Sequence, residues 1–359
     1  MKRKFELSAK SWVVIYLFIL CGICLFAGCR TGSGSTSTLK REKTTPKTKE
    51  TISYTSVTIP MDKDSQKTLV YNPVDHVLTQ IRHKGQTYIR STWQPEKGWT
   101  SNLDSWKLKK HETLENFTYN TNGALYACRK KWKRGALTSQ TLVHLRSHGK
   151  INQVRLTKLN QLSSEGTSSH KIPEIMDLQC SGTSIAITYQ YGAVKIYNLA
   201  EGQALGASFI TGTPGKNIFY NLHYITIQQP ENKNDILLRD YDIRSGEITH
   251  SFPLGGPDQD SSVFHVSSCQ DDLYVLTSRG LFGGQCSDTS LIRLLAYNDL
   301  KLPEQSHVTY LQADGDNSLF WGFQTKEGDF VLRHITLPEN MIEESPQGTN
   351  KDSQVATRI

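Results

Sequence analysis

Apolar and polar residues alternate along short segments of this chain, and these segments recur at a nearly even interval. Apolar side chains at every second position predict a strand with one buried face. The recurring segments are marked, in chain order, by Tyr88, Leu125, Ile185, Ile225, Leu273 and Leu319, about 46 residues apart on average. No segment after residue 50 shows a long helical period. The pattern therefore predicts a repeated all-β architecture.

A second pattern repeats beside the first and indicates how many strands each cycle contains. The stretch VKIYNLAEG places Tyr197, Leu199 and Gly202 at the end of an apolar run. The stretch LLRDYDIRSG repeats this arrangement 44 residues later, and TLVHLRSHG upstream shares part of it. Each cycle reads as an alternating strand, a tight turn, a second strand, a third strand that ends near the tyrosine, and often a fourth. Four short antiparallel strands every ~40 to 50 residues are typical of one blade of a β-propeller.

The number of blades depends on the strands at the start of the domain. Six cycles are visible, and TISYTSVTI (51–59) with KTLVYNP could assemble a seventh. Alternatively these strands complete the last blade, so that an N-terminal strand pairs with the C-terminal blade and closes the ring. A pair of two-sheet sandwiches is the rival architecture, but the even spacing favours the propeller. We therefore expect an all-β fold of six or seven four-stranded blades.

The motif Tyr-x-[Leu/Ile]-x-x-Gly at Tyr197 and Tyr241 resembles the repeats of the quinoprotein-like and YVTN-type propeller families. The quinoprotein families usually carry a tryptophan shortly after the glycine. Here those positions hold Ala204-Leu205 and Ile248-Thr249 instead. The resemblance therefore implies the propeller architecture, and it implies neither a quinone cofactor nor catalytic residues.

The N-terminus has the pattern of an export signal. Basic residues in MKRKFELSAK precede the apolar run 12–28, WVVIYLFILCGICLFAG,. The segment 25–29, LFAGC, resembles the lipobox of bacterial lipoproteins, which implies a lipid on Cys29 and cleavage before it. An uncleaved transmembrane anchor is the alternative, because the run approaches the ~20 residues that span a bilayer. Both interpretations predict a protein attached to the extracytoplasmic face of the cell membrane.

Composition divides the chain into four parts. Residues 1–28 are the predicted lipoprotein signal peptide, and 29–50 are a flexible stalk rich in Gly, Ser, Thr and Lys,. Residues 51–340 are the predicted propeller domain, and 341–359 form a polar, disordered tail. Without residues 1–28 the formal charge falls from +7 to +4, since that segment holds four basic residues and one acidic residue. This mild excess does not predict a nucleic-acid partner.

The sequence contains few signals of chemistry. No nucleophile elbow, HExxH, P-loop or dinucleotide-binding fingerprint is present,. GLFGG (280–284) is expected to be a loop between strands, and ADGDNS (313–318) a hairpin turn rather than a calcium loop. Asp258 and Asp260 could bind a cation or act on a glycoside, although a solvated connector is the simpler interpretation. We predict no catalytic residue, cofactor or metal site.

The cysteines outside the signal segment do not predict a metal site either. Cys128, Cys180, Cys269 and Cys286 are widely spread and form no CxxC pair,. Small buried apolar residues are the simplest interpretation of such cysteines. A disulfide between Cys269 and Cys286 is possible in an oxidising compartment, but spacing alone does not show whether the two sulfurs meet.

Two groups of residues are candidates for an interaction surface. The run RKKWKRG (129–135) includes Lys131, Trp132, Lys133 and Arg134, which could contact anionic lipid headgroups or wall polymers,. The alternative is an ordinary solvated hairpin tip. Trp93 and Trp99, with Trp106, could line a groove for a sugar or peptide, or could instead fill the space between blades.

These features favour a membrane-tethered scaffold that binds an extracytoplasmic protein, peptide or glycan through loops on a rigid ring. A propeller hydrolase or lyase is one alternative, and it requires carboxylates or histidines that converge at the channel mouth. A sensor or assembly subunit of a membrane complex is another. Fold alone does not separate these functions.

Overall fold

The computed structural model of the protein describes residues 55–61, 67–161, 172–206, 208–210, 216–228, 237–253, 263–286, 291–315 and 317–337. The predicted signal peptide, stalk and tail therefore lie outside the described residues, as do Asp258 and Asp260. Among the residues described, none belongs to a helix with the length and apolar character needed to cross a membrane.

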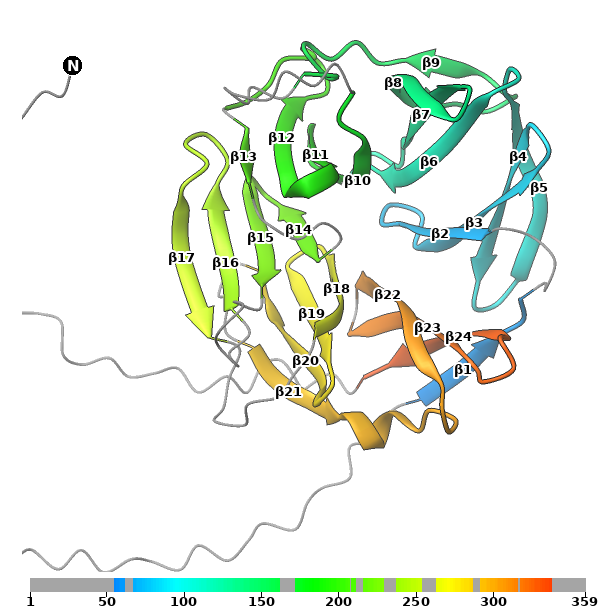
Figure 1. Ribbon diagram of the computed structural model, residues 1–359. Helices are drawn as coiled ribbons and strands as arrows, with labels where there is room; N and C mark the ends of the chain where they lie inside the picture. The colour runs from blue at the N-terminus through cyan, green and yellow to red at the C-terminus, as the bar shows by residue number, and fades with distance from the viewer. Residues whose placement is uncertain are drawn as a thin grey trace, which may run out of the picture. The chain divides into compact units, whose positions relative to one another are not determined.

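Six four-stranded antiparallel sheets stand around a common centre, as Figure 1 shows. This arrangement is a six-bladed β-propeller, and it confirms the predicted fold class. Blades 1 and 2 consist of β2 (Lys67–Asn72), β3 (Val77–Lys84), β4 (Thr87–Gln94) and β5 (Gly98–Lys107), then β6 (Glu112–Tyr119), β7 (Leu125–Lys133), β8 (Ala136–Leu145) and β9 (Ile151–Gln153).

The next three blades repeat this order of four consecutive strands. Blade 3 consists of β10 (Ile175–Ser181), β11 (Ser184–Tyr189), β12 (Ala193–Asn198) and β13 (Phe209–Ile210), with the 3-10 turn η1 (Gln190–Gly192) between β11 and β12. Blade 4 consists of β14 (Asn217–Tyr220), β15 (His223–Gln228), β16 (Leu237–Asp242) and β17 (Ile248–Pro253). Blade 5 consists of β18 (Val263–Cys269), β19 (Asp272–Thr277), β20 (Gly280–Gln285) and β21 (Leu291–Ala296), followed by η2 (Tyr297–Leu300).

The sixth blade takes one strand from the start of the domain. Its inner strands are β22 (His307–Gly315), β23 (Ser318–Gln324) and β24 (Phe330–Thr336), and its outermost strand is β1 (Thr55–Ile59). β1 pairs with β24 from Thr55 opposite Thr336 to Ile59 opposite Leu332. The two ends of the domain therefore meet in one sheet (Figure 1). Of the two alternatives for the first strands, completion of the last blade is the one observed for β1, whereas KTLVYNP contributes β2 to blade 1. We call β1 the clasp strand.

Two details of the predicted repeat were wrong. The segment with Tyr88 is β4, the third strand of its blade, whereas the other five recurring segments are second strands. GLFGG is not a loop but most of strand β20. Glycine is needed inside this strand because a Cβ on Gly283 would lie 2.5 Å from the side chain of Leu294,. The expected turn in ADGDNS is present, since β22 ends at Gly315 and β23 begins at Ser318.

Polar side chains tie neighbouring blades together at the segment that begins the next blade. Gln140 of blade 2 donates from Nε2 to the carbonyl of Pro173 (2.6 Å) and accepts from the backbone N of Ile175 (3.0 Å). Gln179 of blade 3 makes the same pair of bonds to Asn217 and Phe219 of blade 4, at 2.7 and 2.8 Å. An amide side chain offers one donor and one acceptor, so each bridge satisfies two backbone groups of the next blade.

One joint also contains a buried charge. The ammonium of Lys130, only 2% exposed, lies 2.6 Å from the carboxylate of Glu115 and 2.7 Å from that of Glu174. Glu115 belongs to blade 2, and Glu174 immediately precedes the first strand of blade 3. Burial by itself would lower the pKa of the Lys130 ammonium, but its hydrogen bonds to Glu115 and Glu174 outweigh burial and raise that pKa,. Lys130 is therefore charged and structural.

Candidate functional site

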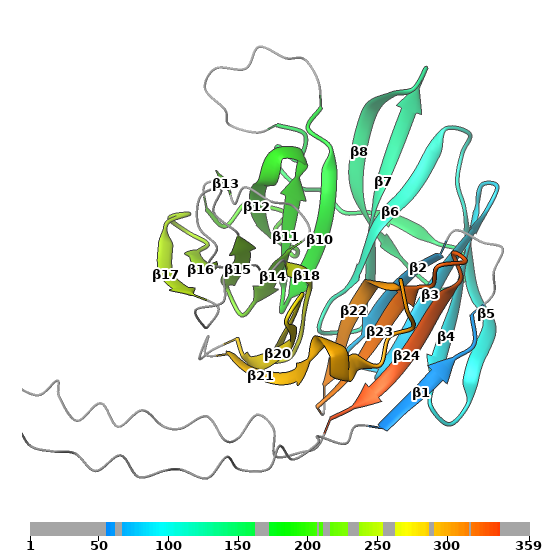
Figure 2. The ribbon, with the colours of Figure 1, turned by 60° about the horizontal axis from the view of Figure 1, so that its bottom comes forward.

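The turns of the propeller lie on two opposite faces, because successive strands run in opposite directions. The β3–β4 and β7–β8 turns lie on one face, and the β4–β5 and β8–β9 turns lie on the other. The β7–β8 hairpin projects at its end of the ring, next to β6, as Figure 2 shows. We call this end of the ring the hairpin face.

The basic run 129–135 is mainly strand rather than hairpin tip. β7 continues to Lys133, and only Arg134 and Gly135, with φ of 53° and 78°, form the turn to β8. Lys131, Lys133 and Arg134 are exposed. Trp132 is half-buried, and its indole Nε1 donates to the Thr113 hydroxyl at 3.2 Å. The hairpin thus presents three cations around one anchored tryptophan.

A second basic segment lies beside this hairpin. The linker between β5 and β6 is held on one side by the backbone N of Leu108, which donates to Gln86 at 2.9 Å. On its other side the backbone N of Trp132 donates to His111, also at 2.9 Å. The linker therefore connects the β3–β4 turn to the β7–β8 hairpin across the hairpin face. Its exposed lysines extend the charge of the hairpin onto blade 1.

We call the exposed cations of these neighbouring segments the basic strip. Its members are exposed side chains on the hairpin face of blades 1 and 2, namely Lys84, Lys107, Lys109, Lys110, Lys131, Lys133 and Arg134. The acidic residue at the start of β6, Glu112, is half-buried and accepts a bond from the backbone N of Lys109 at 3.3 Å. Exposed cations grouped in this way attract anionic groups and raise association rates, and salt screens the effect.

Sequence reasoning found only part of this strip. It selected Lys131, Trp132, Lys133 and Arg134 but passed over the lysines at 107, 109 and 110. The available signal was the local run KLKKH, which is basic in itself. Its importance depends on adjacency to the hairpin, and a distance of ~20 residues along the chain does not reveal that adjacency.

The tryptophans of blade 1 do not form one groove. Trp93 is 4% exposed and lies in the core. Its ring packs edge-on against Phe320 and His334 of blade 6, with ring centroids 5.7 and 5.9 Å apart. Trp106 is fully buried and donates from Nε1 to the carbonyl of Arg146 in blade 2 at 2.9 Å. These two rings therefore fill the spaces between blades, as the packing alternative predicts, and Trp93 is not part of an exposed surface.

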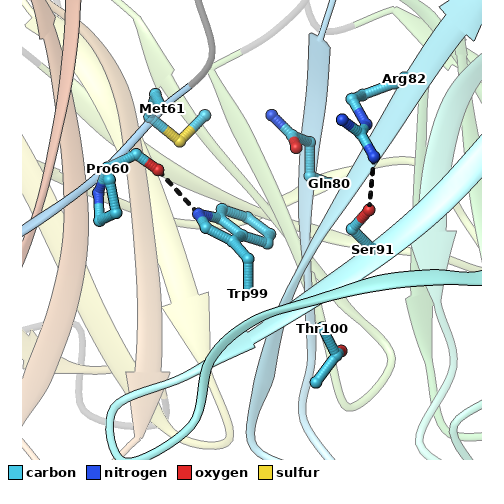
Figure 3. Close-up of a pocket in the computed structure, with 7 residues that line it drawn as sticks. All are labelled: Pro60, Met61, Gln80, Arg82, Ser91, Trp99 and Thr100. Carbon is cyan, nitrogen blue, oxygen red and sulfur yellow. Dashed lines mark hydrogen bonds between the residues drawn. The ribbon is translucent and has the colours of Figure 1, made fainter.

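Trp99 differs, because it lines a cavity where the clasp strand meets blade 1. The cavity has a volume of about 370 Å³ and is lined by Pro60, Met61, Gln80, Arg82, Ser91, Trp99 and Thr100 (Figure 3). Trp99 Nε1 donates to the carbonyl of Pro60 at 2.8 Å, and Arg82 Nη2 donates to the Ser91 hydroxyl at 3.2 Å. We call this space the seam cavity.

Gln80 is the unusual residue of the seam cavity. It is 4% exposed, and its amide Nε2 has no hydrogen-bond partner among the described residues. A buried donor without a partner costs about 1 to 3 kcal/mol of stability. Such a donor in the wall of a cavity is a common sign of a missing partner, such as a ligand or a water molecule.

The polar cluster around Asp314 does not have the order of a catalytic triad. Asp314 lies between the Ser318 hydroxyl, at 2.5 Å, and His334 Nε2, at 2.6 Å. In nucleophilic catalysis the histidine stands between the hydroxyl and the carboxylate, so this order is wrong for a triad. The Tyr71 hydroxyl of blade 1 also donates to the carbonyl of Asp314 at 2.5 Å. The cluster therefore joins blades 6 and 1.

Cys128, Cys269 and Cys286 are buried, and Cys180 is half-buried. Burial raises the pKa of Cys128, Cys180 and Cys286 to about 12, so these thiols are protonated and unreactive at neutral pH,. Cys269 and Cys286 are not joined by a disulfide. In the part of the chain that the structure describes, no three His, Cys, Asp or Glu side chains are placed to hold a metal ion.

No protein-family model and no curated protein sequence matches this chain. Several solved structures are similar in fold. One is the Cps50 (Swd1) beta-propeller domain of Myceliophteria thermophila, with 12% identity over 78% of this chain and 99% of that one, at a TM-score of 0.44. BamB from Moraxella catarrhalis shares 9% identity, covers 77% of this chain and 87% of its own, and has a TM-score of 0.44. An oligogalacturonate lyase in complex with manganese shares 10% identity, covers 78% of this chain and 79% of its own, and has a TM-score of 0.47. This likeness does not bear on function. The class of the protein, a six-bladed β-propeller, rests on its six sheets.

Proposed function

We propose that the protein is an extracytoplasmic interaction scaffold, tethered to the cell membrane through Cys29, whose basic strip binds an anionic protein, peptide or glycan. The observation that supports this function is the gathering of seven exposed cations on one face of two neighbouring blades. Blades 1 and 2 beneath the strip are joined by the backbone N of Leu114, which donates to the Tyr88 hydroxyl at 2.9 Å, and by Trp106 Nε1, which donates to the carbonyl of Arg146 at 2.9 Å, so the strip has a rigid support. A rigid support lowers the entropy cost of binding.

Membrane attachment is tested through the lipobox residue. We expect Cys29→Ser to release the protein from the membrane fraction, since the serine hydroxyl cannot carry a thioether-linked lipid. Mass spectrometry of the wild-type protein is expected to find an N-terminus at Cys29 that bears acyl chains. A Cys29→Ser protein that stays in the membrane fraction with residues 1–28 attached would instead identify an uncleaved anchor.

The basic strip is tested with a defined anionic probe. We expect poly-L-glutamate, immobilised on a biosensor surface, to bind residues 52–359 at low ionic strength. The triple variant Lys131→Gln, Lys133→Gln, Arg134→Gln is expected to bind at least ~10-fold more weakly, equivalent to ~1.4 kcal/mol. Binding of the wild-type protein should weaken steeply as salt rises from ~50 to ~200 mM, because screening shortens the range of each charge.

A matched variant separates the strip from the overall charge. Lys97, Lys150 and Arg244 are exposed cations in turns on the opposite face, and changing all three to Gln removes the same charge. This control is expected to bind poly-L-glutamate like the wild type. Equal losses in the two triple variants would show that net charge alone drives binding, and the basic strip would then lose its role as the binding site.

A further inference from the structure

The seam cavity has the composition of a ligand site rather than of a packing gap. Its volume of about 370 Å³ is near the lower end of the ~300 to 1,000 Å³ range of small-molecule pockets,. Trp99, Met61 and Pro60 supply apolar surface, while Gln80, Arg82, Ser91 and Thr100 supply polar groups. A ligand that fits must therefore combine an apolar face with several hydrogen-bonding groups.

Trp99 is oriented by the clasp strand. The indole Nε1 donates to the carbonyl of Pro60, directly after β1, at 2.8 Å. This bond fixes the direction of the ring, so the half-buried indole keeps one position in the cavity wall. In Figure 3 the side chains of Trp99, Met61 and Gln80 extend toward one another. An indole held in this way offers a rigid apolar surface without losing rotamer freedom on binding.

The polar groups of the cavity favour a hydroxyl-rich ligand. Gln80 carries one amide acceptor and one amide donor, and its Nε2 has no partner among the described residues,. Nε2 is shielded from solvent, but a half-turn about the soft terminal torsion exchanges the two amide atoms. The Ser91 hydroxyl accepts from Arg82 Nη2 and keeps its hydrogen to donate, whereas the Thr100 hydroxyl already donates to the carbonyl of Thr92 at 3.1 Å and can only accept from a ligand,. A ligand hydroxyl can accept from Ser91 and donate to Thr100, whereas a carboxylate can only accept.

From this combination we infer that the seam cavity binds a neutral carbohydrate of one or two sugar rings, with a C–H face of the sugar against Trp99 and a ligand hydroxyl bonded to Gln80. The site lies where the chain leaves the clasp strand and meets blade 1, so a bound sugar contacts Pro60 and Met61 on one side and blade 1 on the other. It is distinct from the basic strip. A carbohydrate at this site requires no anionic group, which makes the two activities separable by experiment.

The experiment uses residues 52–359 and three small probes. Saturation-transfer NMR measures contact between the protein and N,N′-diacetylchitobiose, cellobiose or benzoate, the last being a planar carboxylate. We expect saturation of the sugar ring protons by the wild-type protein. Gln80→Leu should weaken binding of the sugar at least ~10-fold, and Trp99→Ala should abolish it. The strip variant Lys131→Gln, Lys133→Gln, Arg134→Gln should bind the sugars like the wild type.

Two further variants test whether a loss of sugar binding is caused by unfolding of the protein. Trp99→Phe keeps an aromatic face but removes the bond to Pro60, and Thr100→Val removes a hydroxyl without changing side-chain size. Both are expected to fold with cooperative melting curves and to bind sugar at intermediate strength. Absence of transfer to both sugars in the wild-type protein would overturn the proposal. So would unchanged transfer in folded Trp99 and Gln80 variants, or transfer to benzoate alone. None of these results would affect the test of the basic strip.

Discussion

A chain that begins at residue 62 is expected to lose cooperative folding, whereas a chain that begins at residue 52 keeps it. The two differ only by the clasp strand and its immediate neighbours. β1 covers the open edge of β24 through five paired positions, and it places Ile59, 1% exposed, in the core. Burial of one isoleucine contributes about 1.5 to 3 kcal/mol. Adding the lost ladder bonds gives a sum comparable to the ~5 to 15 kcal/mol stability of a whole domain.

Urea unfolding, followed by far-UV circular dichroism and by tryptophan fluorescence, checks this expectation. The longer chain should show coincident transitions with both probes, and the shorter chain should show a broad, shifted transition or none. A milder test keeps the strand and changes Ile59→Asp, which places an unpaired charge in the core. If the chain from residue 62 unfolded with the same midpoint and slope as the longer chain, the clasp would have no role in stability.

Loss of the Lys130 ammonium is expected to destabilise the protein by roughly 3 to 5 kcal/mol in the Lys130→Ala variant. The substitution leaves the carboxylates of Glu115 and Glu174 facing each other at the joint between blades 2 and 3. Their side chains are 38% and 33% exposed, so water screens part of their repulsion and places the loss toward the lower end of that range,. Equilibrium unfolding in urea at pH 7 measures this loss of unfolding free energy.

Two variants show whether charge or volume causes this loss. The neighbouring Lys131→Ala removes an exposed ammonium and should change stability by less than ~0.5 kcal/mol,. Adding Glu115→Gln and Glu174→Gln to Lys130→Met removes all three charges and should recover most of the lost stability. Failure of the triple variant to recover would assign the effect to packing of the lysine stem instead.

The repeated architecture was predictable because its signal is local. Alternation with a period of two requires only neighbouring residues, and turn residues at an even spacing mark the ends of strands. The same locality explains the errors. β4 and β11 both alternate, so pattern alone did not separate a third strand from a second one. Glycine-rich β20 did not look like a strand, because two of its glycines answer to tertiary contacts: Gly283 to the side chain of Leu294 and Gly280 to the carbonyl of Leu295 on β21.

The candidate sites were only partly predictable, because each combines residues from separate blades. The run around Trp132 was visible as a basic segment, but the buried Lys130 was counted with it as though exposed. Trp99 was selected together with Trp93, although the structure places one in a cavity and the other in the core. Alternation along β4 and β5 predicts which side chains share a face of the sheet, but not what packs against that face.

The sequence by itself determined an all-β repeat of short strands and a strand at the start of the domain that could close the ring. Only the tertiary structure decided that six blades form, that β1 joins β24, and that the 107–111 linker lies beside the β7–β8 hairpin. It also decided that Gln80 and Trp99 share a cavity with Met61. The physical reason is that strands are specified by residues two apart, whereas the sites arise where different strands and neighbouring blades meet, and local alternation does not encode those contacts.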